Sequence, residues 1–124
     1  MRTPIELAHG WREALVGRDP RAYAALFAAD AEFIDVEHRT PDGSAPRIVR
    51  GRDAIRVVCE DWLAATPSFD YDVLDAVGDD QRAAKRWRYV VGDADVEGVT
   101  WLDCSAGEIT RALVLFDVGG LASA

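Results

Sequence analysis

The chain has 124 residues, enough for one domain that buries a core without disulfides or a structural metal. Its 22 acidic residues outnumber its 14 Lys and Arg residues, and the net charge of −8 argues against nucleic acid or an anionic membrane as partner. No apolar run is long enough to span a membrane, and the segment MRTPIELAHG has no apolar signal core. We therefore expect a single cytoplasmic domain over residues 1–124.

Two helices and a strand are predicted in the first 37 residues. The run Thr3-Pro4-Ile5-Glu6 is a capping-box pattern that starts a helix, and Gly17 ends that helix. Asp19-Pro20 starts a second helix. Apolar and polar residues then alternate over residues 31–37, which is typical of a strand. One face of that strand carries Ala31, Phe33 and Asp35.

The middle of the chain predicts a long loop followed by the clearest helix. Residues 38–50 contain two prolines and a glycine with little periodicity, so they are expected to form a loop. A loop of that length in a small domain is often functional. Apolar residues then keep helical spacing from Gly51 to Thr66, and Pro67 ends this third helix.

The last half of the chain alternates with a period of two. Short polar turns between alternating segments predict antiparallel hairpins. The element order therefore predicts an α+β fold, in which three N-terminal helices pack on one face of a curved antiparallel sheet. The four strands are expected at Phe69–Val77, Gln81–Val91, Val96–Cys104 and Glu108–Val118.

This element order resembles the nuclear transport factor 2-like superfamily, with ALFAADAEFID after the second helix and GRDAIRVVCEDW at the start of the third. The resemblance runs from the first helix to the LVLFD segment at residues 113–117. The enzyme branch of the superfamily includes ketosteroid isomerase and the SnoaL-like polyketide cyclases. The resemblance implies a single SnoaL-like domain, a cone-shaped, cystatin-like α+β barrel around a deep and mostly apolar pocket. It also implies a dimer, because many members are dimers.

The resemblance to the isomerase branch places a general base at Asp35. In that branch the catalytic aspartate lies eight residues after the Phe of the ALF motif, which is Phe27 here. The two oxyanion donors do not carry over, since their positions fall at Gly10 and near Val99, and Asp103 takes the second only with a four-residue shift. Steroid isomerisation is therefore not implied, because a base alone leaves the developing enolate unstabilised.

Strand alternation and the resemblance together predict an aromatic pocket around Asp35. A carboxylate there would be desolvated and reluctant to ionise, so it could exchange protons as a general acid or base. Such walls suit a small apolar, aromatic or polycyclic ligand, although the same side chains could simply fill a core. The predicted walls are the strand residues Phe33, Trp87, Tyr89, Val99, Trp101, Ala112, Val114 and Phe116, and the helix residues Trp11, Tyr23, Val58 and Trp62.

Two more residues are catalytic candidates. His38 could carry a second proton, or it could be a solvated loop histidine. Asp103 could assist Asp35, or it could serve the turn that follows it. Asp35 has alternatives of its own, which are solvation at the pocket rim or pairing with an arginine of the next segment, namely Arg39, Arg47 or Arg50.

No metal and no cofactor are expected. The sequence has no HxH, HExxH or GxGxxG motif. Cys59 and Cys104 form no CxxC pair, and with only two histidines they argue against a zinc site. We expect two reduced thiols that are partly buried, with a single disulfide as the alternative.

These patterns predict a cofactor-independent enzyme that isomerises, cyclises or dehydrates a small apolar carbonyl compound, with Asp35 as general acid or base. A non-catalytic ligand-binding or assembly module is the alternative. An epoxide hydrolase or epoxide-opening cyclase is a further one, and an arginine or a second carboxylate beside Asp35 would favour it. Arg86 and Arg88 alternate with Trp87, so they are expected to face outward. An apolar outer sheet face with Ile109, Leu113 and Leu115 would favour a homodimer.

Overall fold

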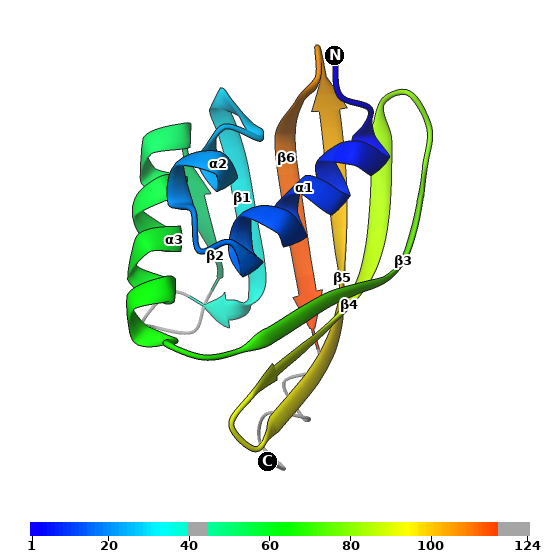
Figure 1. The fold of residues 1–124 in the computed structure, drawn as a ribbon. Coiled ribbons are helices and arrows are strands. Elements are labelled where there is room, and N and C mark those ends of the chain that lie inside the picture. Colours follow the sequence, from blue (N-terminus) through cyan, green and yellow to red (C-terminus); the bar gives the residue numbers. More distant parts are fainter. Residues whose placement is uncertain (40–44, 117–124) are drawn as a thin grey trace.

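Three helices and six strands make up the described part of the chain, shown as a ribbon in Figure 1. The structure is a computed structural model that describes residues 1–39 and 45–116, without the side chains of residues 37–39 and 116. The strands form one sheet in the order β2-β1-β6-β5-β4-β3. In chain order the elements are α1 (Pro4–Val16), α2 (Pro20–Ala24), β1 (Phe27–Arg39), β2 (Pro46–Arg50), α3 (Arg52–Ala65), β3 (Asp70–Gly78), β4 (Arg82–Val91), β5 (Ala94–Ser105) and β6 (Glu108–Phe116).

The helices cover one face of a strongly curved sheet, so the expected α+β architecture is confirmed. Helix α1 crosses that face and contacts β3, β4, β5 and β6. Helix α3 packs on α2 and on the β1–β2 end of the sheet, as Figure 1 shows. The sheet is antiparallel except for one pairing, because β1 runs parallel to β6. That pairing is possible because the chain returns to β1 only after the whole β3–β6 meander.

The helix starts follow the sequence signals. Thr3 caps α1, and Glu6 returns a hydrogen bond to the backbone of Thr3, which is the complete capping box. Asp19 caps α2 by accepting a hydrogen bond from the backbone N–H of Ala22. Helix α3 begins after Gly51, within one residue of the predicted start.

The loop predicted over residues 38–50 is wrong for its second half. Residues 46–50 form β2, which pairs antiparallel with β1 and matches Phe33 with Val49 and Asp35 with Arg47. Pro46 made residues 46–50 look like a loop in the sequence. A proline is tolerated at the first residue of an edge strand, however, because no hydrogen bond of the sheet requires its missing N–H. Strand β1 is also longer than predicted, at Phe27–Arg39.

The expected inward orientation of Val99 and Trp101 is also wrong. The β4–β5 hairpin pairs Trp87 with Gly98 and Lys85 with Thr100, so the even-numbered positions of β5 face inward. Val99 and Trp101 therefore lie on the outer face, 41% and 42% exposed.

A one-residue irregularity in β6 explains the error. Asp103 pairs with Arg111 but Cys104 pairs with Ile109, so Thr110 is the extra residue of a β-bulge. Without the bulge, Val114 would face Val99, and a one-residue slip exchanges the two faces of a strand. The bulge also turns Ile109 inward, where it is fully buried and not part of the outer face as expected.

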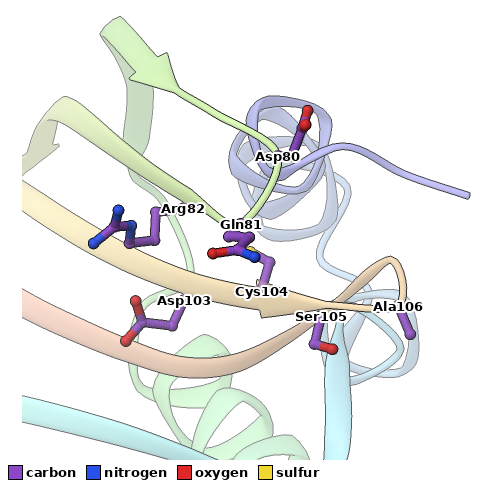
Figure 2. Close-up of a pocket in the computed structure, with 7 residues that line it drawn as sticks. All are labelled: Asp80, Gln81, Arg82, Asp103, Cys104, Ser105 and Ala106. Carbon is purple, nitrogen blue, oxygen red and sulfur yellow. The ribbon is translucent and has the colours of Figure 1, made fainter.

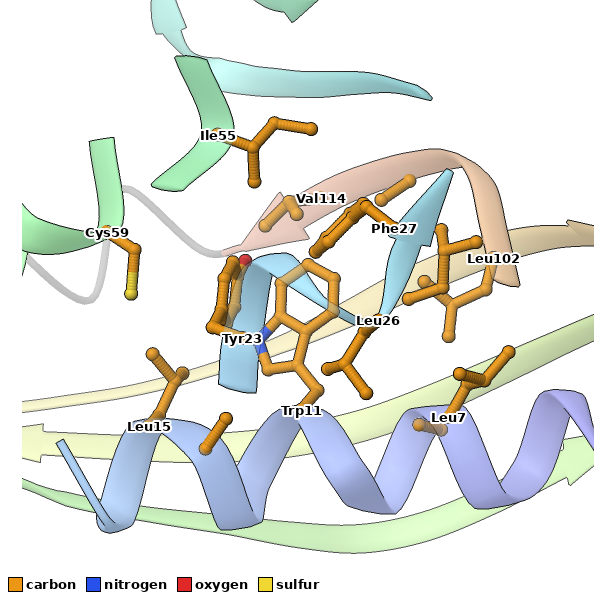
Figure 3. Close-up of a cluster of buried hydrophobic side chains, with 14 of the residues drawn as sticks. Leu7, Trp11, Leu15, Tyr23, Leu26, Phe27, Ile55, Cys59, Leu102 and Val114 are labelled. Atoms are coloured by element: carbon orange, nitrogen blue, oxygen red, sulfur yellow. The ribbon is translucent and has the colours of Figure 1, made fainter. Parts of the chain in front are cut away.

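The core lies between α1 and the concave face of the sheet. Figure 3 shows Trp11 projecting from α1 towards Tyr23 and Phe27. Its ring centroid is 5.0 Å from that of Tyr23, 5.6 Å from that of Phe27 and 5.9 Å from that of Phe33. Rings at these separations attract one another beyond the burial of their area. Trp11 is therefore the contact that joins the first helix to the first strand.

Gly98 should tolerate no side chain. A Cβ at this position would lie 2.2 Å from the Trp87 ring and 2.5 Å from the carbonyl oxygen of Leu115. Gly98→Ala should therefore lower the free energy of unfolding by about 1–3 kcal/mol, the usual cost of overpacking a core. Chemical denaturation would measure this, with Glu97→Ala at the exposed neighbouring position as control. Equal stability of the two variants would contradict the described packing of Trp87 on Gly98.

Candidate active site

Asp35 lies inside the molecule. It is 6% exposed and sits on the concave face of β1, on the same side as Phe33, which stacks on Trp11. The strand pairings place it in a line of residues that crosses the sheet, in which it pairs with Val114, Val114 with Thr100, and Thr100 with Lys85. We call this line, extended to the Arg47 partner of Asp35, the inner row. Its members are Arg47, Asp35, Val114, Thr100 and Lys85.

Lys85 is the unexpected member of the inner row. It is the only lysine among the chain's 14 Lys and Arg residues, and its side chain is fully buried. Its Nζ lies 3.9 Å from the ring centroid of Trp11 and 5.3 Å from that of Tyr71. No hydrogen-bond partner of Nζ exists in the part of the chain that the structure describes.

The surroundings of Lys85 favour its neutral form. Moving an ammonium group out of water costs roughly several kcal/mol, even after the protein around it relaxes. Cation–π contact with aromatic rings supplies only about 0.5–2 kcal/mol. The desolvation cost of the ammonium group therefore exceeds its cation–π attraction, and burial lowers the pKa of Lys85 well below its ordinary value. A neutral amine inside an aromatic enclosure is a base and a nucleophile.

Arg47 stands at the opposite end of the inner row. It is directly across from Asp35 in the β1–β2 ladder and alternates with the outward-facing Ile48, on the same side as the core residue Val49. Its Nε is buried, and no described residue accepts a hydrogen bond from it. Arg50, by contrast, bonds to Glu32 on the other side of the strand pair, 3.2 Å away. Of the arginines named as alternatives for Asp35, Arg47 therefore lies beside it in the sheet.

Two tyrosines join the site, and both stay protonated. Burial, together with nearby Cys59, Tyr71 and Asp35, raises the pKa of Tyr23 well above its ordinary value. Burial also raises the pKa of Tyr71, which stacks on Trp87 with 5.8 Å between ring centroids. A phenol that keeps its proton can donate a hydrogen bond to developing negative charge.

Trp87 is tied to the inner row by a hydrogen bond. Its indole Nε1 donates to Thr100 Oγ1 at 2.9 Å, and both side chains are buried. The bond satisfies the two polar groups and orients the indole against Gly98. Thr100 thus holds one wall of the interior in place.

Most of the predicted wall residues lie on the interior side. Trp62 and Tyr89 form a second aromatic group with Phe69, at centroid separations of 4.8, 5.5 and 6.1 Å. Val58 is half-buried on α3. The side chain of Phe116 lies outside the described part of the structure. The buried or half-buried wall residues are Trp11, Tyr23, Phe33, Trp87, Ala112 and Val114.

The structure separates Asp103 from Asp35. Asp103 is on the outer side of β5, where it accepts a hydrogen bond from Trp101 Nε1 at 3.1 Å. Figure 2 shows it beside Arg82 at a surface hollow of about 550 Å³, which no member of the inner row lines. His38 lies in β1, but its side chain is outside the described part of the structure, so its predicted role stays a prediction.

Metal-binding side chains do not gather in this site. Within residues 1–36 and 45–115, no three His, Cys, Asp or Glu side chains come together as a metal site would require. Cys59 and Cys104 are both free, and burial raises the pKa of each thiol to about 11. Across the described helices, none is long and apolar enough to cross a membrane.

Sequence reasoning missed Lys85, Tyr71 and Thr100, although a signal existed for the first. Arg86 and Arg88 are exposed, as alternation with Trp87 predicts, and the same alternation places Lys85 inward. The occurrence of a single lysine in an arginine-rich chain also marks this position. Thr100 was not identified because the bulge at Thr110 hides the register of β5.

Three helices on the concave face of a bent six-stranded sheet give the described part of the chain the α+β architecture of the nuclear transport factor 2-like class. The sequence model of the SnoaL-like domain matches residues 8–112, and the chain belongs to this family. A comparison with curated protein sequences found no match.

Solved structures share the fold. One is a hypothetical protein with a ketosteroid isomerase-like fold from Catenulispora acidiphila DSM 44928, in complex with trimethylamine, with 21% identity, a TM-score of 0.79 and coverage of 98% of this chain and 92% of that one. Another is a candidate SnoaL-like polyketide cyclase from Jannaschia sp. CCS1, with 11% identity, a TM-score of 0.78 and coverage of 98% and 90%. A third is a candidate ketosteroid isomerase from Kribbella flavida DSM 17836, with 23% identity, a TM-score of 0.72 and coverage of 90% and 75%. At these identities the likeness shows the fold alone.

Removal of the buried amine should change how stability depends on pH. The unfolded chain holds the Lys85 proton up to a pKa of about 10.4, whereas the folded chain releases it at lower pH. Between these two pKa values the free energy of unfolding rises with pH, by up to about 1.4 kcal/mol per unit. Lys85→Met lacks this rise. Denaturant titrations from about pH 6 to pH 9 should therefore give a wild-type-minus-variant difference that grows with pH.

The difference between the two proteins isolates Lys85. Tyr23 and Tyr71 face the same interior, but their raised pKa values keep both protonated across this range. Asp35, in the same row, is present in both proteins. A difference that stays constant with pH would mean that Lys85 is charged in the folded state as well as in the unfolded state, and would contradict its lowered pKa.

Proposed function

We propose that the protein is a cofactor-independent enzyme that transfers protons on a small apolar substrate with a carbonyl group, as isomerases, cyclases and dehydratases do. Asp35 is the general acid or base. The observation that carries this proposal is its burial beside aromatic side chains, at the family position of the catalytic aspartate. A carboxyl group held against aromatic walls can pass a proton to and from a bound substrate while water is excluded.

Stabilisation of the developing enolate is assigned to the tyrosines. Ketosteroid isomerase-type donors are absent at the aligned positions Gly10 and Val99, and Val99 faces outward. Tyr23 keeps its proton and lies near enough to Asp35 for the carboxyl group to affect its pKa. It is therefore our candidate hydrogen-bond donor, with the indole of Trp11 5.0 Å away, centroid to centroid, as the aromatic wall.

The comparisons support the binding of a small ligand. The Catenulispora structure holds trimethylamine, and the Jannaschia and Kribbella proteins are described as a candidate polyketide cyclase and a candidate ketosteroid isomerase. For this chain we propose an uncharged apolar carbonyl compound, because the described interior consists mainly of rings and aliphatic side chains.

Epoxide opening is a second candidate, and Arg47 favours it. An arginine directly across the ladder from a buried carboxyl group could help Asp35 protonate an epoxide oxygen or activate water. The outward-facing Arg86 and Arg88 do not contribute to such a pair. Arg47→Met should impair epoxide opening but leave the rate of proton exchange at the carbon beside a carbonyl group unchanged.

Asp35→Asn should lower proton exchange at the carbon next to the carbonyl group by at least about 10²-fold, the usual contribution of a general acid or base. The assay is nuclear magnetic resonance in D₂O on a panel of small apolar ketones and aldehydes. Asp61→Asn, which changes an exposed carboxylate of α3, is the matched control and should exchange at the wild-type rate. Unchanged exchange in the Asp35 variant would refute its role, and ligand binding without exchange would favour a passive binding module.

For the assembly we propose a homodimer formed by the outer face of the sheet. Its exposed apolar residues lie in register on neighbouring strands, since Val99 pairs with Leu115 and Trp101 with Leu113. Val99, Trp101 and Leu115 are each about two-fifths exposed. An apolar group of this kind on a sheet face marks a contact surface.

A charge on this face should separate the two copies. Trp101→Glu should shift the protein from dimer to monomer, because burying an unpaired carboxylate in an apolar interface costs roughly several kcal/mol. Light scattering coupled to size-exclusion chromatography measures the mass. Asp93→Lys, in the β4–β5 turn, is the control and should remain dimeric. A monomeric wild-type protein would contradict this assembly.

A further inference from the structure

We propose that the single lysine, Lys85, binds the substrate covalently, as an imine formed between its Nζ and the carbonyl carbon of a small aldehyde or ketone. The inference rests on the proposed function in one respect, which is that the substrate carries a carbonyl group. It adds a second reacting group to Asp35 and narrows the substrate to carbonyl carbons open to attack by an amine.

The position of the amine carries the inference. Lys85 is 0% exposed, and its Nζ is 3.9 Å from the Trp11 centroid with no hydrogen-bond partner in the described chain. A structural lysine normally pairs its ammonium group with an acid or leads it to solvent. The other charged side chains of β4, Arg82, Arg86 and Arg88, do reach solvent, and Arg88 pairs with Asp95. Lys85 alone points into the aromatic interior.

The chemistry of this enclosure suits a neutral amine. Burial lowers the pKa of Lys85, so the lone pair needed for attack on a carbonyl carbon is available near neutral pH. Arginine could not serve here, because its guanidinium stays protonated in proteins. That difference gives a chemical reason for one lysine in a chain with 13 arginines.

The inner row provides the second group that imine chemistry needs. Asp35 and Lys85 face the same concave interior from β1 and β4, with β6 and β5 between them. Three strand spacings separate their backbones by about 14 Å on a flat sheet, and the curvature of this sheet brings the side-chain ends closer. The two groups therefore face the same bound molecule, Lys85 at its carbonyl carbon and Asp35 at the oxygen and the carbon next to it.

The reaction balances without a cofactor. The Nζ lone pair forms a bond to the carbonyl carbon, the C=O pair moves to oxygen, and a proton passes from nitrogen to that oxygen. Asp35, in its protonated form, gives a proton to the resulting hydroxyl group, the C–O bond breaks, and water leaves an iminium ion. The Asp35 carboxylate then takes a proton from the neighbouring carbon to give an enamine. Where the substrate has a C=C bond next to that carbon, the proton returns to the far end of the conjugated enamine, and addition of water then releases the isomerised carbonyl product, the free amine and the proton of Asp35.

Reductive trapping tests the inference directly. Folded protein is incubated at neutral pH with propanal and cyanoborohydride, which reduces an imine to a stable secondary amine, and mass spectrometry locates the modified residue. Lys85 should be modified at least about tenfold faster than an exposed lysine, of which only about one in 10³ is neutral at this pH. The N-terminal amine provides an internal reference, and Lys85→Met should lose the internal adduct.

The neighbouring residue offers a matched control. Arg86→Lys places a lysine on the exposed outer face of the same strand, and this introduced lysine should be modified slowly. Modification of the introduced lysine with none at Lys85 would overturn the inference, with urea-unfolded protein confirming that the Lys85 peptide is detectable. Asp35→Asn separates the two proposals. A slower adduct supports both, whereas an adduct at the wild-type rate counts against the proposed role of Asp35 and still supports the imine at Lys85.

Discussion

The register of β5 between its two neighbours is the constraint on which the interior depends. The hairpin to β4 turns Gly98, Thr100 and Leu102 inward, whereas a regular hairpin to β6 would turn Val99 and Trp101 inward instead. The bulge at Thr110 removes the conflict, and the Thr110 hydroxyl donates to the Asp103 carbonyl oxygen at 3.1 Å where the ladder is interrupted. Because of this one extra residue, a buried lysine, a buried threonine and a buried aspartate share one line across the sheet.

The desolvation of that line explains its chemistry. Helix α1 covers the concave face with Trp11, and the ring contacts of Trp11 with Tyr23 and Phe33 leave little room for solvent. Under this cover the amine of Lys85 and the phenols of Tyr23 and Tyr71 favour their neutral forms, because burial shifts the pKa of each group in that direction. A neutral phenol can donate a hydrogen bond or a proton, and a neutral amine can accept one.

Membership of the SnoaL-like family agrees with this arrangement but does not determine the reaction. The family fold supplies the bent sheet and the cover of helices, while activity depends on the few polar groups that a member places inside. In this chain those groups are Asp35, Arg47, Thr100 and Lys85, together with two buried tyrosines. Asp103 lies on the outer face of the sheet, so Asp35 is the acidic member of the inner row. The inner row therefore holds one acid and one amine, and Asp103, which the sequence offered as a candidate second acid, is not part of it.

Local sequence signals determined the helices, the order of the elements and the burial of Asp35. A capping box at Thr3, prolines at helix starts and strict alternation in β4 act over a few residues, so they can be read without knowledge of the fold. The pairing of β2 with β1, the parallel contact of β1 with β6 and the bulge at Thr110 were decided only in the tertiary structure. Those features depend on strands far apart in the chain, and a single inserted residue reverses the facing of every side chain beyond it. For that reason alternation could place Trp87 and Lys85 on one side of β4, but only the assembled sheet could bring Lys85 into line with Asp35.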